Sequence, residues 1–151
     1  MYKRILFSTC LTEYCEHIFT FALNMAKENN AKLWIYHGLG RLNLNEDETN
    51  KKIAEAETRV KEAYENKLRD KDLEAYMINV SDGDVVTEIT KLARNAKIDA
   101  IIMGTATKSP IAAGEDIRVG PLGQVTANTI LWSPCPVLVV PPALVPGLTR
   151  R

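Results

Sequence analysis

The sequence predicts one α/β domain built on a five-stranded parallel sheet with helices on both faces. Strand-like apolar segments alternate with helix-like segments along the whole chain, which is the pattern of consecutive βαβ units. The first, fourth and last of these strands are apolar almost throughout, as strands buried on both faces are. The length of 151 residues suits one domain, which we place at residues 1–141, followed by a proline-rich tail at 142–151.

The first half of the chain predicts two strands, each followed by a helix. Residues 5–7 and 33–36 are the strands. Thr12 is the expected N-cap of the first helix, whose apolar residues recur at helical spacing until Asn29 and Asn30 end it. A polar loop over residues 43–50 then leads into a long amphipathic helix with many Lys and Glu residues on its outer face.

The second half predicts three more strands, at residues 75–80, 99–104 and 136–140. Residues 81–84 form a turn and cap before a third helix, whose apolar stripe runs from Val86 to Ala96. A long loop over residues 105–121 leaves the fourth strand, and a short helix follows at about 122–132. Loops of this length in compact domains are commonly functional.

In a doubly wound sheet, ligands bind at the carboxyl ends of the strands where the winding direction reverses. If the first and fourth strands flank that reversal, the binding site lies around residues 9–12 and 104–125. A glycine at a strand end allows close approach of a ligand, and a glycine at the start of a helix exposes N–H groups that attract phosphate. Gly104 and Gly123 fit this pattern, although both fit tight turns equally well.

Other chemistry receives less support from the sequence. The stretch Gly38-Leu39-Gly40 lacks the third glycine and the following helix of a dinucleotide fingerprint, so we interpret it as a turn. His17 is expected on a helix surface and His37 at a strand end near the crevice. We predict no metal site and no catalytic residues. The three cysteines, an odd count without CxxC spacing, predict small buried apolar residues rather than a disulfide framework.

Composition excludes further classes of partner. Nineteen basic residues balance nineteen acidic ones, which argues against nucleic-acid binding because that binding needs excess positive charge. No apolar run is long enough to span a membrane, and the apolar stretch after Arg4 is too short for a signal peptide. We therefore expect a soluble cytoplasmic protein.

Several segments resemble the universal stress protein family. They are the opening stretch at residues 2–9, the Gly83-Asp84 pair, the strand at 99–104 and the segment Pro134-Cys135-Pro136 with the strand after it. The resemblance covers about residues 2–140. It implies a Rossmann-like fold of the adenine nucleotide alpha hydrolase type, with strand order 3-2-1-4-5. It also implies homodimers paired through the last strand, at Val137, Leu138, Val139 and Val140.

The resemblance further implies a site for an adenine nucleotide, with ATP or AMP as the ligand. Its residues are Thr9, Cys10, Leu11, Gly38, Met103, Gly104, Thr105, Thr107, Gly123, Gln124 and Val125. Many family members bind ATP through G-x-x-G, a gap of about nine residues, and then Gly-Ser or Gly-Thr.

This chain departs from that pattern at three positions. Thr107 replaces the second glycine, and the gap from Thr107 to Gly123 is fifteen residues. Gln124 replaces the hydroxyl residue, and Cys10 replaces an Asp that contacts adenine in nucleotide-binding members.

We therefore predict a dimeric stress-response or signalling module that acts through unidentified protein partners and binds an adenine nucleotide weakly. The alternative is a slow ATP-hydrolysing enzyme with residues 105–121 as its lid. The phosphate-binding glycines of related hydrolases are absent after the first strand, where the chain has Ser8-Thr9-Cys10, so the module is favoured.

Overall fold

A computed structural model of the chain describes residues 2–105 and 122–144. Its sheet has five parallel strands in the order β3-β2-β1-β4-β5, which confirms both the predicted sheet and the order that the resemblance implied. The strands are β1 (Arg4–Ser8), β2 (Lys32–Gly38), β3 (Tyr76–Ser81), β4 (Ala100–Gly104) and β5 (Val137–Val140). The central strand β1 has β2 on one side and β4 on the other, so the winding direction reverses there.

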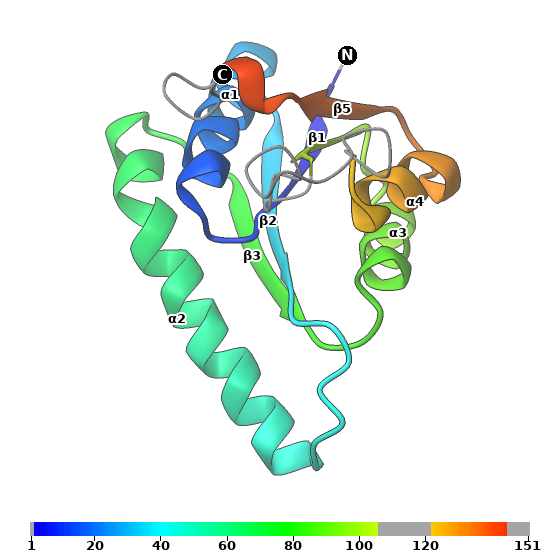
Figure 1. Ribbon diagram of the computed structural model, residues 1–151. Helices are drawn as coiled ribbons and strands as arrows, with labels where there is room; N and C mark the ends of the chain where they lie inside the picture. The colour runs from blue at the N-terminus through cyan, green and yellow to red at the C-terminus, as the bar shows by residue number, and fades with distance from the viewer. Residues whose placement is uncertain (1, 106–121, 145–151) are drawn as a thin grey trace.

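Helices cover both faces of this sheet (Figure 1). Helices α1 (Glu13–Asn29) and α2 (Glu46–Asp70) lie over one face, and α3 (Val85–Asn95) and α4 (Gln124–Trp132) lie over the other. A short 3-10 helix, η1 (Pro142–Leu144), follows β5, within the segment predicted as the tail. The rest of that tail and most of the 105–121 loop lie outside the described residues.

Side-chain caps fix where the helices begin. Thr12 caps α1 as predicted, because its Oγ1 accepts the N–H of Cys15 at 3.4 Å. Helix α2 begins at Glu46, inside the stretch that the sequence predicted as a loop to residue 50, so that prediction was wrong. The reason is Asn45, whose Oδ1 accepts the N–H of Glu48 at 2.8 Å and so starts the helix early.

Alternate residues of the strands point to opposite faces and build two apolar cores. On the face of α1 and α2, Ile5 and Phe7 pack with residues of both helices. On the other face, Leu6 packs with Ile89 and Ala93 of α3. Because the strands feed both cores, they read as continuous apolar runs in the sequence.

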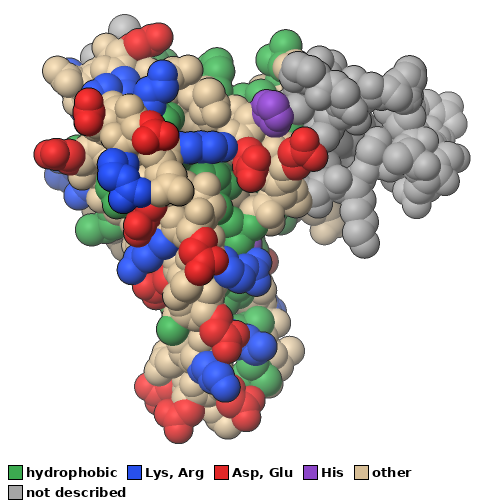
Figure 2. Space-filling view, turned by 90° about the vertical axis from the view of Figure 1, so that its left-hand side faces the viewer, with side chains coloured by type: hydrophobic (Ala, Val, Ile, Leu, Met, Phe, Trp, Pro, Cys, Tyr) green, Lys and Arg blue, Asp and Glu red, His purple; other side chains and the backbone are tan. Residues whose placement is uncertain are grey.

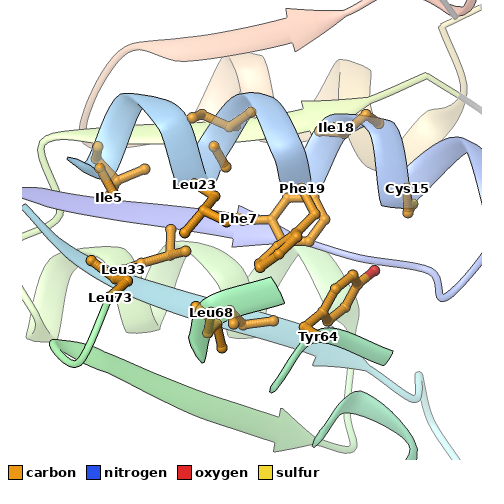
Figure 3. Close-up of a cluster of buried hydrophobic side chains, with 14 of the residues drawn as sticks. Ile5, Phe7, Cys15, Ile18, Phe19, Leu23, Leu33, Tyr64, Leu68 and Leu73 are labelled. Carbon is orange, nitrogen blue, oxygen red and sulfur yellow. The ribbon is translucent and has the colours of Figure 1, made fainter. Parts of the chain in front are cut away.

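Three aromatic rings form the centre of the first core (Figure 3). Phe19 of α1 lies 4.3 Å from Tyr64 of α2, and Phe7 of β1 lies 5.6 Å from Phe19 and 5.7 Å from Tyr64, between ring centroids. The two separations that involve Phe7 fall in the range in which aromatic pairs attract beyond simple burial, and the rings of Phe19 and Tyr64 lie slightly closer. The three rings therefore join the central strand to both helices on this face.

The outer surface of α2 carries interspersed positive and negative side chains (Figure 2). This agrees with the solvated face predicted for the long helix. In the described part of the chain, no helix is both long and apolar enough to cross a membrane.

The aromatic centre should govern stability. Phe19 is fully buried, whereas Phe21 on the same helix is 46% exposed. We predict that Phe19→Ala lowers the free energy of unfolding by about 3–5 kcal/mol, because it removes burial and leaves a cavity. The matched change Phe21→Ala should stay within about 1 kcal/mol of the wild type. Urea unfolding followed by circular dichroism measures both, and equal losses would contradict this account of the core.

Candidate functional site

A crevice lies at the carboxyl ends of β1 and β4. After β1 the chain enters α1 on one face of the sheet, whereas α4 lies on the other face, so the two strand ends open a gap. The cavity has a volume of about 430 Å³, within the range of small-molecule sites. Its lining is formed by Ser8, Thr9, Cys10, Cys15, His37, Gly38, Val85, Met103, Gly104, Thr105, Leu122, Gly123, Gln124, Val125 and Thr126.

The structure brings most of the predicted site residues to this cavity. The lining includes Thr9, Cys10, Gly38, Met103, Gly104, Thr105, Gly123, Gln124 and Val125. Leu11 is not among the lining residues: its backbone is left-handed (φ 62°) and its side chain packs against the core of α1 and α2. Thr107 lies outside the described residues. Thr105 and Leu122, on either side of the undescribed segment, both line the cavity.

Sequence reasoning missed Cys15, Val85 and Thr126 as lining residues, along with Ser8. Leu122 lines the cavity and lies within the predicted span of residues 104–125, although it was not named as a site residue. The sequence contained a signal for two of these residues. Cys15 and Thr126 each lie in the first turn of a helix that begins at the crevice, so both were within reach of it. His37 was expected near the crevice and does line it, and His17 is exposed on α1 as expected.

Thr9 holds the β1 end of the crevice in place. Its N–H donates to the carbonyl of Tyr36 at 2.9 Å, and its carbonyl accepts Nδ1 of His37 at 2.8 Å. Its hydroxyl lies 2.5 Å from the hydroxyl of Tyr64 and accepts the N–H of Leu11 at 3.0 Å. Thr9 is only 4% exposed, so these contacts satisfy its buried polar groups. Burial raises the pKa of Tyr64, which therefore stays a neutral hydroxyl.

Gly104 has a packing role that the sequence did not reveal. A Cβ at this position would lie 2.5 Å from Cδ1 of Ile18 and 2.7 Å from the ring of Tyr14. The absence of a side chain therefore lets α1 pack against the end of β4. Tyr14 then donates its hydroxyl to the carbonyl of Val140 and accepts the N–H of Thr105, so one ring holds β4 and β5 together.

Gly123 shapes the other wall, where α4 begins. It is the N-cap of α4 with φ 85°, a left-handed conformation that favours glycine. Glycine offers no side-chain oxygen to the first N–H groups of the helix, and the first turn contains no acidic residue. Thr126 Oγ1 donates to the carbonyl of Gly104 at 2.7 Å and fixes this helix end against β4. The arrangement suits an anion, because a helix start is positively polarised.

The lining residues carry little formal charge. None of those in the described part of the chain is Asp, Glu, Lys or Arg. The Thr9 carbonyl can only accept, so Nδ1 of His37 carries the proton of that bond. Among the described residues, no cluster of three His, Cys, Asp or Glu side chains could hold a metal ion.

The cysteines differ from the buried apolar residues that we predicted. Only Cys15 is buried, whereas Cys10 is exposed and Cys135 is intermediate. The Sγ atoms of Cys10 and Cys15 lie 2.8 Å apart at the start of α1. The prediction of burial failed for Cys10 and Cys135 because both lie in connecting segments, one between β1 and α1 and the other between α4 and β5.

Comparison with known proteins identifies the family. The model of the universal stress protein family matches residues 1–141. The chain belongs to this family. No curated protein sequence matches it significantly.

Solved universal stress proteins share the fold. UspA from Lactobacillus plantarum is 22% identical with a TM-score of 0.69, and the match covers 92% of this chain and 97% of that one. A universal stress protein in complex with cAMP is 23% identical with a TM-score of 0.68, over 92% and 96% of the two chains. A universal stress protein from Archaeoglobus fulgidus in complex with dAMP is 16% identical with a TM-score of 0.58, over 91% and 97%.

The hydroxyl pair of Thr9 and Tyr64 should be measurable as a coupling. Thr9→Val and Tyr64→Phe should each lower the free energy of unfolding by about 1–3 kcal/mol, because each strands a buried hydroxyl or N–H. The double variant should lose less than the sum, by at least about 0.5 kcal/mol. Urea unfolding of the four proteins gives this coupling.

Thr90→Val supplies the control for this cycle. Thr90 is 5% exposed and, among the described residues, its hydroxyl bonds only within α3, on the opposite face of the sheet from Tyr64. Its effect should therefore add to that of Tyr64→Phe. If the losses in the free energy of unfolding caused by Thr9→Val and Tyr64→Phe also add, the short contact between the two hydroxyls contributes no coupling.

Proposed function

We propose that this protein is a stress-response module that binds an adenine nucleotide in the crevice between β1 and β4. The observation that carries the proposal is the uncharged cavity at the reversal of the sheet, closed on one wall by the glycine-capped start of α4. Family membership supports it, because two universal stress proteins of the same fold are in complex with cAMP and dAMP.

The proposed pose follows from the chemistry of the two walls. The phosphate lies at the start of α4, where the N–H groups of Gln124 and Val125 and the helix dipole attract it. The base lies toward the end of β4, where Met103 supplies apolar contact, and Val85 at the start of α3 adds to that contact. Cys10 is a weak acceptor where the family resemblance implied an Asp, so we expect the affinity to be micromolar at best.

We further propose that the crevice binds the nucleotide without turning it over. A hydrolytic site needs a group that activates water and a charge or metal that stabilises the leaving phosphate. The described lining offers neither a carboxylate nor a Lys or Arg side chain. The lid of the alternative reading, residues 105–121, lies almost entirely outside the described residues.

We also propose a homodimer formed through β5, working in the cytoplasm. The described cysteines are free thiols, as suits a reducing compartment. Strand β5 is an edge of the sheet, and unpaired edges invite pairing with another chain. The most exposed large apolar side chains in the described ranges lie in the segments just before and just after this strand: Leu131 (74%), Trp132 (69%) and Leu144 (70%). Exposed apolar side chains on the segments that flank an open edge favour an interaction surface there.

The backbone of β5 presents open groups to a partner strand. Ile101 of β4 donates its N–H to the carbonyl of Pro136 at 3.0 Å. The backbone N–H and C=O groups of successive residues in a strand point alternately to one neighbour and to the other. The backbone groups of Leu138 and Val140 therefore also point to β4, while those of Val137 and Val139 point outward. Antiparallel pairing of two copies would satisfy these groups around a two-fold axis.

Nucleotide binding can be tested by thermal shift and calorimetry with AMP, cAMP and ATP. A nucleotide present at 100 times its dissociation constant stabilises the fold by about 2.7 kcal/mol, which corresponds to a rise in Tm of roughly 5–10 °C. Gly123→Val should abolish the shift, because its side chain crowds the helix start that holds the phosphate.

Gly40→Val is the matched control. Gly40 also has a positive φ (75°), yet nothing lies within 4 Å of a Cβ at that position and it does not line the cavity. It should bind AMP like the wild type. The proposal fails if no adenine nucleotide binds at millimolar concentration, or if Gly123→Val binds unchanged. Recovery of ADP or AMP from ATP above a heat-treated control would favour the enzyme instead.

The dimer can be tested with proline substitutions on the two edge strands of the sheet, β5 and β3. The wild type should sediment at about twice the chain mass of 16.9 kDa. Val139→Pro removes an outward N–H of β5 and should give monomer or insoluble protein. Val80→Pro makes the matched change on the opposite edge, because the Ala75 carbonyl accepts from Leu33 and the N–H of Val80 therefore faces away from β2. A wild-type monomer at micromolar concentration, or a dimer that Val139→Pro leaves intact, would contradict this interface.

A further inference from the structure

The start of α1 holds two sulfur atoms almost in bonding contact. The Sγ atoms of Cys10 and Cys15 lie 2.8 Å apart. A disulfide bond is about 2.05 Å long, so closure requires a movement of only about 1 Å. The left-handed backbone of Leu11 (φ 62°) forms the turn that brings Cys10 back toward the helix.

The surroundings divide the pair into a thiolate and a thiol. Cys15 lies in the first turn of α1, where the helix dipole favours negative charge, and its Sγ accepts the N–H of Cys10 at 3.3 Å. The hydrogen bond from the Cys10 thiol lowers the pKa of Cys15. The same bond and burial raise the pKa of Cys10, because the proton is held between the two sulfurs. Cys15 is thus the nucleophile and Cys10 the proton donor.

The pair is also open to small molecules. Cys15 is only 3% exposed, but it and Cys10 both line the crevice, and Cys10 is exposed at the surface. A small reagent that enters the crevice therefore reaches both sulfurs. Thiolate character together with access is what makes a cysteine pair reactive rather than structural.

We propose that Cys10 and Cys15 form a redox-active dithiol that a hydroperoxide converts to an intramolecular disulfide at the wall of the crevice. The Cys15 thiolate attacks one oxygen of hydrogen peroxide. The O–O bond breaks, Cys15 becomes a sulfenic acid, and the leaving hydroxide becomes water by taking from solvent the proton that Cys15 released when its thiolate formed. The Cys10 sulfur then attacks Cys15, the S–O bond breaks, and the hydroxide leaves with the Cys10 proton as a second water. Two thiols are oxidised and one peroxide is reduced to two waters.

The sequence provides a clean assay for this bond. Residues 5–26 contain no Lys or Arg, so trypsin releases Cys10 and Cys15 together in the peptide 5–27, while Cys135 leaves in a separate peptide after Arg118. The full chain is treated with hydrogen peroxide, alkylated, digested and analysed by mass spectrometry. In the wild type, peptide 5–27 should lose about 2 Da and both alkylation sites, and dithiothreitol should restore them.

Variants separate the two roles. In Cys10→Ser, Cys15 should stop at the sulfenic acid, which dimedone traps. In Cys15→Ala, the reaction of Cys10 with peroxide should be at least tenfold slower than that of the wild-type pair. Cys135→Ser should behave like the wild type, because burial raises the pKa of Cys135 and keeps it a thiol. Urea unfolding confirms that each variant is folded, and Cys10→Ala repeats the first test without a new hydroxyl.

Two results would overturn the proposal. One is a wild-type peptide 5–27 that keeps both thiols under peroxide concentrations that oxidise Cys135. The other is a Cys15→Ala variant whose Cys10 reacts as fast as the wild-type pair.

A nucleotide should slow the oxidation, and this arm alone rests on the proposed function. Because Cys10 and Cys15 line the crevice, saturating AMP should lower the rate at least threefold. AMP that binds and leaves the rate unchanged would place the ligand away from the dithiol. Absence of AMP binding would sink the proposed function while the mass shift still reports the disulfide.

Discussion

The hydrogen bonds of Thr9 are the constraint on which the rest of the molecule depends. They tie the end of the central strand to Tyr36 and His37 of β2 and to Tyr64 of α2. At this point the chain leaves the sheet for α1, while β4 beside it leads to the opposite face. If the end of β1 were not held in place, the positions of the two crevice walls relative to each other would not be fixed. Tyr64 also belongs to the aromatic centre of the core, so core packing and crevice geometry are set together.

Sequence patterns predicted the strands and helices well, but they did not by themselves give the order of the strands in the sheet. Alternating apolar runs and helical spacing are local, so they identified the five strands and the four α-helices of the described chain, but not the short helix η1. Strand order depends on contacts between distant segments, and it came from the family resemblance instead. The start of α2 was misplaced because a polar stretch resembles a loop until one residue, Asn45, is known to cap it. Capping is a single-residue event that hydrophobic periodicity does not register.

The location of the site could be predicted from the sequence, but the contacts between its residues could not. The rule that ligands bind where the winding direction of a sheet reverses located the crevice at the carboxyl ends of β1 and β4. It could not show that Gly104 is needed for packing against Tyr14 and Ile18, since those residues lie more than eighty positions away in the chain. It could not show the contact of Cys10 and Cys15 either, because that contact depends on the left-handed turn at Leu11.

Cys10 links the two chemical properties of the crevice. The family resemblance implied an Asp at this position, which would give adenine an acceptor. A carboxylate there would also repel negative charge on Cys15, whose sulfur accepts the Cys10 N–H at the start of α1. A thiol instead donates to that sulfur and stabilises it as a thiolate. The residue that we expect to weaken the recognition of adenine is therefore the one that completes the proposed dithiol.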